Sequence, residues 1–148
     1  MSDLVPRPAA SNEGLKVLVS NRQDREIDET GLVELAARVL RAEGVAGPAE
    51  LSLSFVTESE MEDLHLRYMG EPGPTDVLSF PMGDDGLIGD VVVCPAQAAA
   101  NNPSDTGGEL RLLVVHGVLH LLGYDHEDEK ERAVMWSRQG AYSEMGPR

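Results

Sequence analysis

The segment from Leu110 to Leu122 constrains the fold of this chain most, because it is apolar on almost every side. A helix that is apolar all round belongs in the core of a protein. Two histidines, His116 and His120, interrupt the segment four positions apart, so both rings lie on one helix face, about 6 Å apart along the axis. Desolvating a polar ring without a partner costs roughly 2 to 7 kcal/mol. The segment therefore predicts a buried helix in which either each histidine has its own hydrogen-bond acceptor or both share one metal ion.

A glycine and a third histidine continue the pattern. Gly123 suits the left-handed turn that ends a helix, and a chain that reverses there can bring His126 to the same point. Three imidazoles leave a fourth position open, as in catalytic zinc sites, and water bound there has its pKa lowered to about 7. We predict hydrolysis at one zinc ion held by His116, His120 and His126. Asp125 is a candidate for orienting a ligand histidine, although an exposed turn explains this residue equally well.

The spacing of the three histidines and the glycine is also that of the metzincin proteases. Their motif carries a glutamate directly after the first histidine as general base. Gly117 occupies that position here. Glycine can neither activate water nor protonate an amine leaving group. A metalloprotease is therefore the disfavoured alternative.

Two further blocks precede the histidine motif. They are Pro74-Thr75-Asp76-Val77-Leu78-Ser79-Phe80-Pro81 and Gly89-Asp90-Val91-Val92-Val93-Cys94-Pro95. With these three blocks in this order, the chain resembles the YbeY family of bacterial endoribonucleases from about Leu15 to Met135. The resemblance implies a zinc-dependent, single-strand-specific endoribonuclease that acts in small-subunit ribosomal RNA maturation and ribosome quality control. It also implies RNA and a ribosome or ribosomal protein as partners.

The chain departs from the family pattern at Met69. Members commonly carry Tyr-Arg shortly before the Pro-Thr-Asp block, and that arginine is linked to RNA cleavage. Arg67 is a poor substitute, because residues two apart do not share a helix face. Thr75 and Asp76 are candidates for contacting the substrate, but a turn made by proline and aspartate explains them as well. The other catalytic residues stay unassigned, and the nucleophile is either water at the metal or the 2′-hydroxyl of the RNA.

Net charge weighs against nucleic-acid binding. The formal charge is −14 and the basic residues are scattered, whereas affinity for RNA comes largely from Lys and Arg on phosphates. We therefore expect weak binding of free RNA and positioning of the strand by a ribosomal partner. A non-catalytic ribosome-assembly factor, in which zinc only stabilises the fold, is the other alternative.

Length and cysteine content limit the number of domains and the cellular compartment that the chain can have. A chain of 148 residues fits one domain, and it has no long apolar run, no apolar leader and one cysteine. We expect a cytoplasmic protein with no membrane association, and a core position for Cys94. His65, alone on its predicted helix, is left out of the metal site.

The hydrophobic pattern predicts an α/β (α+β) fold. We expect a mobile N-terminal tail over 1–14 and a single metal-dependent hydrolase domain over 15–148. The domain should contain a mixed sheet of about four strands with packed helices, including the zincin-like metal helix. Strands are expected at 15–20, 51–56, 77–80 and 88–94. Helices are expected at 30–43, 95–101 and 127–142 and across the histidine pair. A further helix should begin at a capping box over 57–60 and end near Gly70.

Overall fold

Five strands of the described chain form one mixed sheet, in the order β1-β2-β3-β5-β4. The computed structural model describes residues 7–12, 14–84, 86–124 and 129–143. The elements are β1 (Arg7–Asn12), β2 (Leu15–Asn21), α1 (Glu29–Ala42), β3 (Ala49–Phe55), α2 (Glu58–Met69), β4 (Val77–Asp84), β5 (Leu87–Val93), α3 (Pro95–Asn101), α4 (Thr106–Leu121) and α5 (Glu129–Ser143). Among these helices, none is long and apolar enough to cross a membrane.

The sheet is parallel at its centre and antiparallel at both edges. β2 pairs with β3 and β3 with β5 in parallel, while β1 and β4 run antiparallel to their neighbours. The parallel pair β2 and β3 is joined through α1, as a parallel connection requires a crossover. The predicted α/β class with a mixed sheet is confirmed, with one strand more than expected.

The additional strand is β1, and over 7–12 it corrects the expectation of a mobile tail, which was made for 1–14; residues 1–6 and 13 lie outside the described residues. Arg7–Asn12 pairs with β2, with an irregularity between Pro8 and Ala10. The prolines and the polar composition led to the wrong prediction for this stretch. An edge strand accepts proline, because the side of its backbone that faces solvent needs no donor. Pairing with β2 uses main-chain groups and leaves little trace in the hydrophobic pattern.

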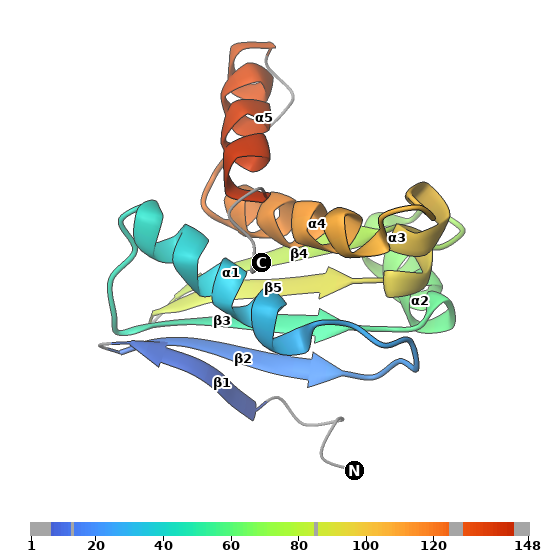
Figure 1. The fold of residues 1–148 in the computed structure, drawn as a ribbon, viewed down its shortest axis with the longest axis horizontal. Coiled ribbons are helices and arrows are strands. Elements are labelled where there is room, and N and C mark those ends of the chain that lie inside the picture. Colours follow the sequence, from blue (N-terminus) through green and yellow to red (C-terminus); the bar gives the residue numbers. More distant parts are fainter. Residues whose placement is uncertain (1–6, 13, 85, 125–128, 144–148) are drawn as a thin grey trace.

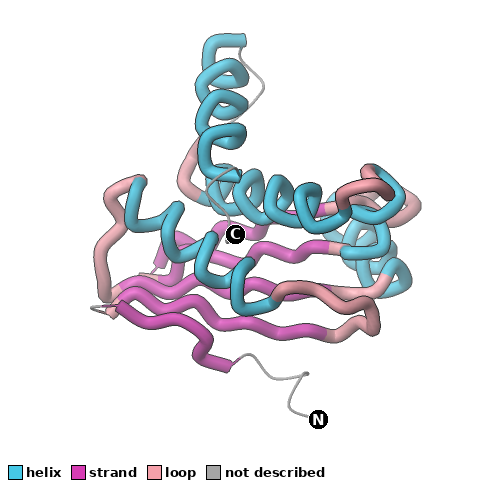
Figure 2. Tube along the Cα trace, in the orientation of Figure 1, coloured by secondary structure: helices cyan, strands magenta, loops and turns pink. Residues whose placement is uncertain are grey.

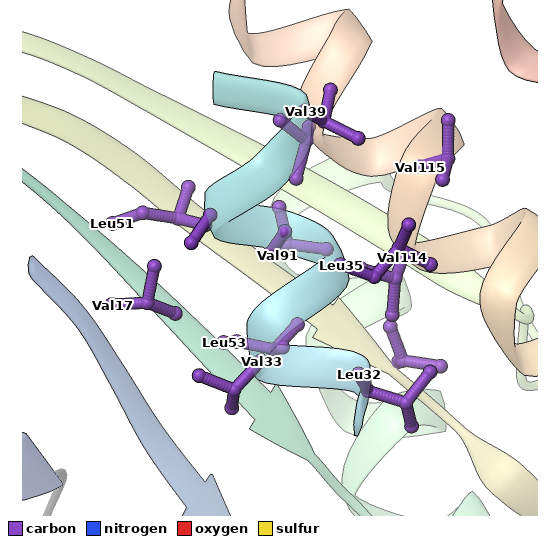
Figure 3. Packing of buried hydrophobic residues seen from close by; sticks show 14 of the residues in the cluster. Val17, Leu32, Val33, Leu35, Val39, Leu51, Leu53, Val91, Val114 and Val115 are labelled. Atoms are coloured by element: carbon purple, nitrogen blue, oxygen red, sulfur yellow. The ribbon is translucent and has the colours of Figure 1, made fainter. Parts of the chain in front are cut away.

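The main core lies between the sheet and the two helices α1 and α4, which cross the same face of the sheet (Figure 1). Alternate residues of β3 point to this side, so Leu51, Leu53 and Phe55 are fully buried. The apolar stripe of α1 meets them from above, and Leu35 and the valines of α1 fill the space between helix and strands (Figure 3). The intervening residues of β3 are serines, which face the opposite side of the sheet.

α4 is the central helix of the fold, as its apolar sequence predicts. Asp105 caps its first turn by accepting from the Gly108 amide at 3.0 Å. At its end, Gly123 has φ of +102°, and the amides of Gly123 and Tyr124 donate back to the carbonyls of His120 and Leu119. These two bonds form a Schellman motif and confirm the predicted helix stop at Gly123.

α4 is not buried on every side, which corrects the expectation of a fully buried helix. His120 is exposed, and His116 is half-buried. α5 packs on α4 and otherwise stands away from the sheet (Figure 2). The histidines therefore lie on the open side of α4, and the cost of desolvating His120 is smaller than the sequence suggested.

α2 covers part of the other face of the sheet. A second apolar cluster lies there and contains Val56, Met61, Leu78, Val92 and Cys94. The predicted core position of Cys94 is confirmed, and burial raises the pKa of its thiol. Thr57 caps α2 by accepting from the Glu60 amide at 3.1 Å. The reciprocal half of the expected capping box is wrong, because the Glu60 carboxylate pairs with Arg22 at 2.6 Å instead.

Candidate metal centre

The rings of His116 and His120 lie side by side on α4. Their centroids are 6.3 Å apart and their planes differ by 8°. Two imidazoles on one tetrahedral zinc ion, each with its nitrogen about 2.1 Å from the metal, have centroids separated by about 5 Å. A side-chain rotation that closes about 1 Å would bring the pair to that separation. The described histidine pair therefore fits two ligand positions of one zinc ion.

Gln139 holds the ring of His116 in place, a contact that the sequence analysis did not predict. Its Oε1 lies 2.9 Å from Nδ1 of His116. The amide oxygen of glutamine can only accept, so Nδ1 carries the hydrogen and donates it. The lone pair of the neutral ring is then on Nε2, which is the arrangement that a metal-binding histidine needs. Gln139 comes from α5, 23 positions away, and the sequence carries no signal for the contact.

Gly117 sets how closely α4 approaches the sheet beneath the histidines. A Cβ added at Gly117 would lie 2.5 Å from Cγ1 of Val91 on β5 and 3.3 Å from the hydroxyl oxygen of Ser79 on β4. The Ser79 hydroxyl donates to the Gly117 carbonyl at 3.1 Å. Position 117 therefore faces the sheet, and a glutamate side chain has no room there. The geometry adds a steric argument to the chemical one against a metalloprotease.

Two of the expected site residues, His126 and Asp125, lie outside the described residues. Within the ranges that are described, no group of three or more His, Cys, Asp or Glu side chains is gathered closely enough to hold a metal ion. The third ligand and the orienting carboxylate thus remain predictions from the sequence.

Asp76 lies away from the histidine pair. Its carboxylate accepts from Nδ2 of Asn101 at 3.0 Å, and the same amide donates to Glu109 at 3.3 Å. Glu109 precedes His116 by seven residues, which is about 10 Å along the helix axis. Thr75 is half-buried in the same segment. The contacts of Asp76 connect β4, α3 and α4, in keeping with the structural explanation of the Pro-Thr-Asp turn.

The fourth histidine has a structural partner. Nδ1 of His65 on α2 lies 2.8 Å from the Gly73 carbonyl and closes the loop between α2 and β4. This contact agrees with leaving His65 out of the metal site.

Glu43, at the end of α1, ties the C-terminal part of the chain to the core. Its carboxylate accepts from the hydroxyls of Tyr124 and Tyr142 and from the Arg138 guanidinium. Burial by itself raises the pKa of Glu43, but the bonds from the two tyrosines and the charge of Arg138 outweigh it, so the net pKa is lowered. The same contacts anchor α5, which carries Gln139, and Tyr124, which follows the helix stop. The Glu43 cluster is here defined as these four residues.

Together, the fold and the site define a single α/β domain that carries a histidine pair, suited to a metal ion, on the helix over its sheet. A family model described as Endoribonuclease YbeY matches residues 18–145. The chain belongs to this family, and the resemblance noted in the sequence is confirmed.

Individual relatives agree with the family match. The Endoribonuclease YbeY of Streptomyces coelicolor is 41% identical over 144 aligned residues, which cover 86% of this chain and 87% of the relative. That of Thermobifida fusca is 44% identical over 140 residues, covering 84% and 90%. The solution structure of TM1509 from Thermotoga maritima superposes with a TM-score of 0.61 at 28% identity, over 88% of this chain and 87% of the other. The fold is therefore shared over nearly the whole length.

Proposed function

We propose that this protein is a zinc-dependent endoribonuclease that cuts single-stranded RNA, and that it acts in the cytoplasm on small-subunit ribosomal RNA during maturation and quality control of the ribosome. The observation that carries the proposal is the stacked pair His116 and His120 on the open side of α4, in a chain of the Endoribonuclease YbeY family. A ribosomal partner fits the net charge of −14, since an acidic protein gains little affinity from phosphates alone.

The residues of the chain have separate tasks in this proposal. His116 and His120 would hold the zinc ion together with His126. Bound zinc would supply a Lewis acid for the phosphodiester oxygens and lower the pKa of water. Gln139 keeps the hydrogen of His116 on Nδ1 and leaves Nε2 to face the ligand position. Gly117 carries no acid or base, so proton transfer falls to another group or to the RNA itself.

The test combines metal analysis with RNA cleavage. The purified full chain should contain one zinc ion and cut single-stranded RNA, and a chelator should abolish cleavage. His120→Ala should lose both zinc and activity, because three ligands are needed for a tight catalytic site. His65→Ala is the matched control, since it removes a histidine outside the pair, and it should keep both. Unchanged zinc content and cleavage in His120→Ala would refute the proposal.

The ends of the products identify the nucleophile. Attack by the 2′-hydroxyl of the RNA leaves a 2′,3′-cyclic phosphate, whereas attack by water leaves a plain phosphate at one end. Mass spectrometry of the cleaved RNA separates these outcomes without any change to the protein.

A second candidate is a ribosome-assembly factor whose zinc serves only stability. Met69 favours it, because this residue is 49% exposed at the end of α2, where family members commonly carry the arginine linked to cleavage. Such a factor would bind ribosomal particles and leave single-stranded RNA intact with zinc present. The cleavage assay on the wild-type chain therefore decides between the two candidates.

A further inference from the structure

A cavity lined by both polar and apolar side chains lies on the face of the sheet opposite α4, beneath α2. Its volume is about 460 Å³, which is within the range of small-molecule sites, about 300 to 1,000 Å³. Its lining includes side chains from β3, β4, β5 and α2 and the arginine that follows β2. None of these groups takes part in the candidate metal centre.

The floor of the cavity is a row of neighbouring residues across three strands. Ser52 on β3 pairs with Asp90 on β5, and Asp90 pairs with Phe80 on β4. In the next row Ser54 lies beside Val92. Residues two apart on a strand share a face, so both rows point into the same space. Polar groups from β3 and β5 thus lie next to apolar ones from β4 and β5.

One stripe of α2 forms the wall. Glu60, Leu64 and Tyr68 are spaced four apart and face the cavity. The rings of Tyr68 and Phe80 meet edge to face, with centroids 5.3 Å apart and planes at 68°. Tyr68 lines the cavity and is 58% exposed, so its side chain is accessible to a ligand at the mouth. A flat ring that enters the cavity would find aromatic surface on this side.

The charges of the cavity favour an uncharged ligand over a phosphate. Arg22 holds Glu60 through both Nε and Nη2 and also donates to Ser20, so its charge is already engaged. Asp90 adds a carboxylate, and within the described chain neither this group nor the hydroxyls of Ser52 and Ser54 have a hydrogen-bond partner. The cavity therefore carries net negative charge and offers acceptors to a ligand with N–H donors.

We propose that this cavity binds one nucleobase, with the ring against Tyr68 and Phe80 and its amino group donating to Asp90. Cytosine, guanine and adenine each carry an amino group whose hydrogen bond a carboxylate can accept, uracil carries none, and aromatic side chains stack on bases of any sequence. The cavity lies close to the metal helix across the edge of the sheet. Ser79 on β4 contacts Gly117 on one face, and the next residue, Phe80, lines the cavity on the other. A strand of RNA that passes around β4 can therefore reach both sites.

The role of the cavity in holding substrate rests on the proposed function, but its occupation by a base is tested without cleavage. Nucleosides have no phosphodiester bond, so they report binding alone. Adding cytidine, guanosine, uridine or adenosine to the full, zinc-loaded chain should shift the backbone amide signals of Ser52, Ser54, Asp90 and Val92 in NMR spectra. Cytidine, guanosine and adenosine should bind more tightly than uridine, whose base has no amino group. Shifts that are absent, or confined to residues outside the cavity, would overturn the proposal.

Matched variants sharpen the result. Asp90→Asn should weaken cytidine binding about tenfold, because it replaces a charged acceptor by a neutral one. Glu62→Gln removes the same charge from an exposed position on the far side of α2 and should leave binding unchanged. Tyr68→Ala should weaken all four nucleosides, whereas Leu66→Ala, also exposed on α2, should not. Equal binding by Asp90→Asn and the wild type would contradict the assignment of Asp90.

Cleavage of single-stranded RNA by the same preparation separates the two proposals. A wild-type chain that cuts RNA without shifts in the cavity refutes the base site alone. A chain that shows these shifts but leaves RNA intact refutes the nuclease alone and leaves the base site standing.

Discussion

The hydrogen bond between His116 and Gln139 decides which nitrogen of the ring faces outward. The ring has two chemically distinct nitrogens, and a hydrogen-bond partner on one of them decides which nitrogen carries the hydrogen. Gln139 supplies that partner from α5 at 2.9 Å. The orientation of a ligand histidine thus depends on how α5 packs on α4, and not on α4 alone.

Gln139→Leu should weaken zinc binding about 10- to 100-fold, because it removes the acceptor and frees the ring to rotate. Gln139→Glu keeps an acceptor at the same position and should retain affinity. Ser137→Ala, at an exposed position of the same helix, controls for changes in α5. Competition with a coloured chelator gives the dissociation constants. Wild-type affinity in Gln139→Leu would show that the bond does not position the ligand.

At the scale of the elements, the close contact between α4 and the sheet depends on Gly117. Alanine is the better helix former by up to about 1 kcal/mol, so the intrinsic preference favours replacing this glycine. The added Cβ would lie 2.5 Å from Cγ1 of Val91, and overpacking of a core costs about 1 to 3 kcal/mol. The steric cost is the larger of the two.

Gly117→Ala should therefore lower the free energy of unfolding by about 1 to 2 kcal/mol, measured by urea denaturation. Gly140→Ala on α5 has no atom within 4 Å of the added Cβ and should raise it by up to about 1 kcal/mol. Adding Val91→Ala to Gly117→Ala should cost less than the two separate losses together, since the smaller side chain makes room. A stabilising effect of Gly117→Ala would contradict the contact.

Local signals predicted the elements well, and contacts between distant residues escaped prediction. The cap at Thr57 and the stop at Gly123 depend on three or four neighbouring residues, and both are found. The spacing of His116 and His120 is likewise a property of one helix. By contrast, Glu60 meets Arg22 across 38 positions, and that ion pair displaced the expected capping box.

The same distinction applies to the sites. The histidine pair follows from the period of α4, but Gln139 and the cavity under α2 arise only when separate elements come together. β1 was missed for a related reason, since it is recognised by the free edge of β2 and not by a pattern of its own. Tertiary structure supplies these features, and the linear sequence carries no periodic signal for them.

On the scale of the whole molecule, the Glu43 cluster joins α1, the end of α4 and α5. The Glu43 side chain is only 9% exposed and bonds to residues 81, 95 and 99 positions away. These bonds lower its pKa from the ordinary value of 4.5, although burial opposes them. The stabilisation is therefore complete above about pH 4.5 and is lost as the pH falls through the lower pKa of the folded state.

Glu43→Gln should lower the free energy of unfolding by about 2 kcal/mol at pH 7, because three donors lose a charged acceptor. The chain has 26 acidic residues, so its own stability changes with pH for many reasons. The difference between variant and wild type isolates Glu43, and it should shrink as the pH falls below 4.5 and through the lowered pKa of the folded state, where the carboxylate becomes protonated and resembles the amide. Glu34→Gln, at an exposed position of α1, controls for net charge and should cost little at pH 7. Urea denaturation over a series of pH values from 7 downward measures the difference, and a loss that stays the same over the whole series would show that the charge of Glu43 does not hold α5 in place.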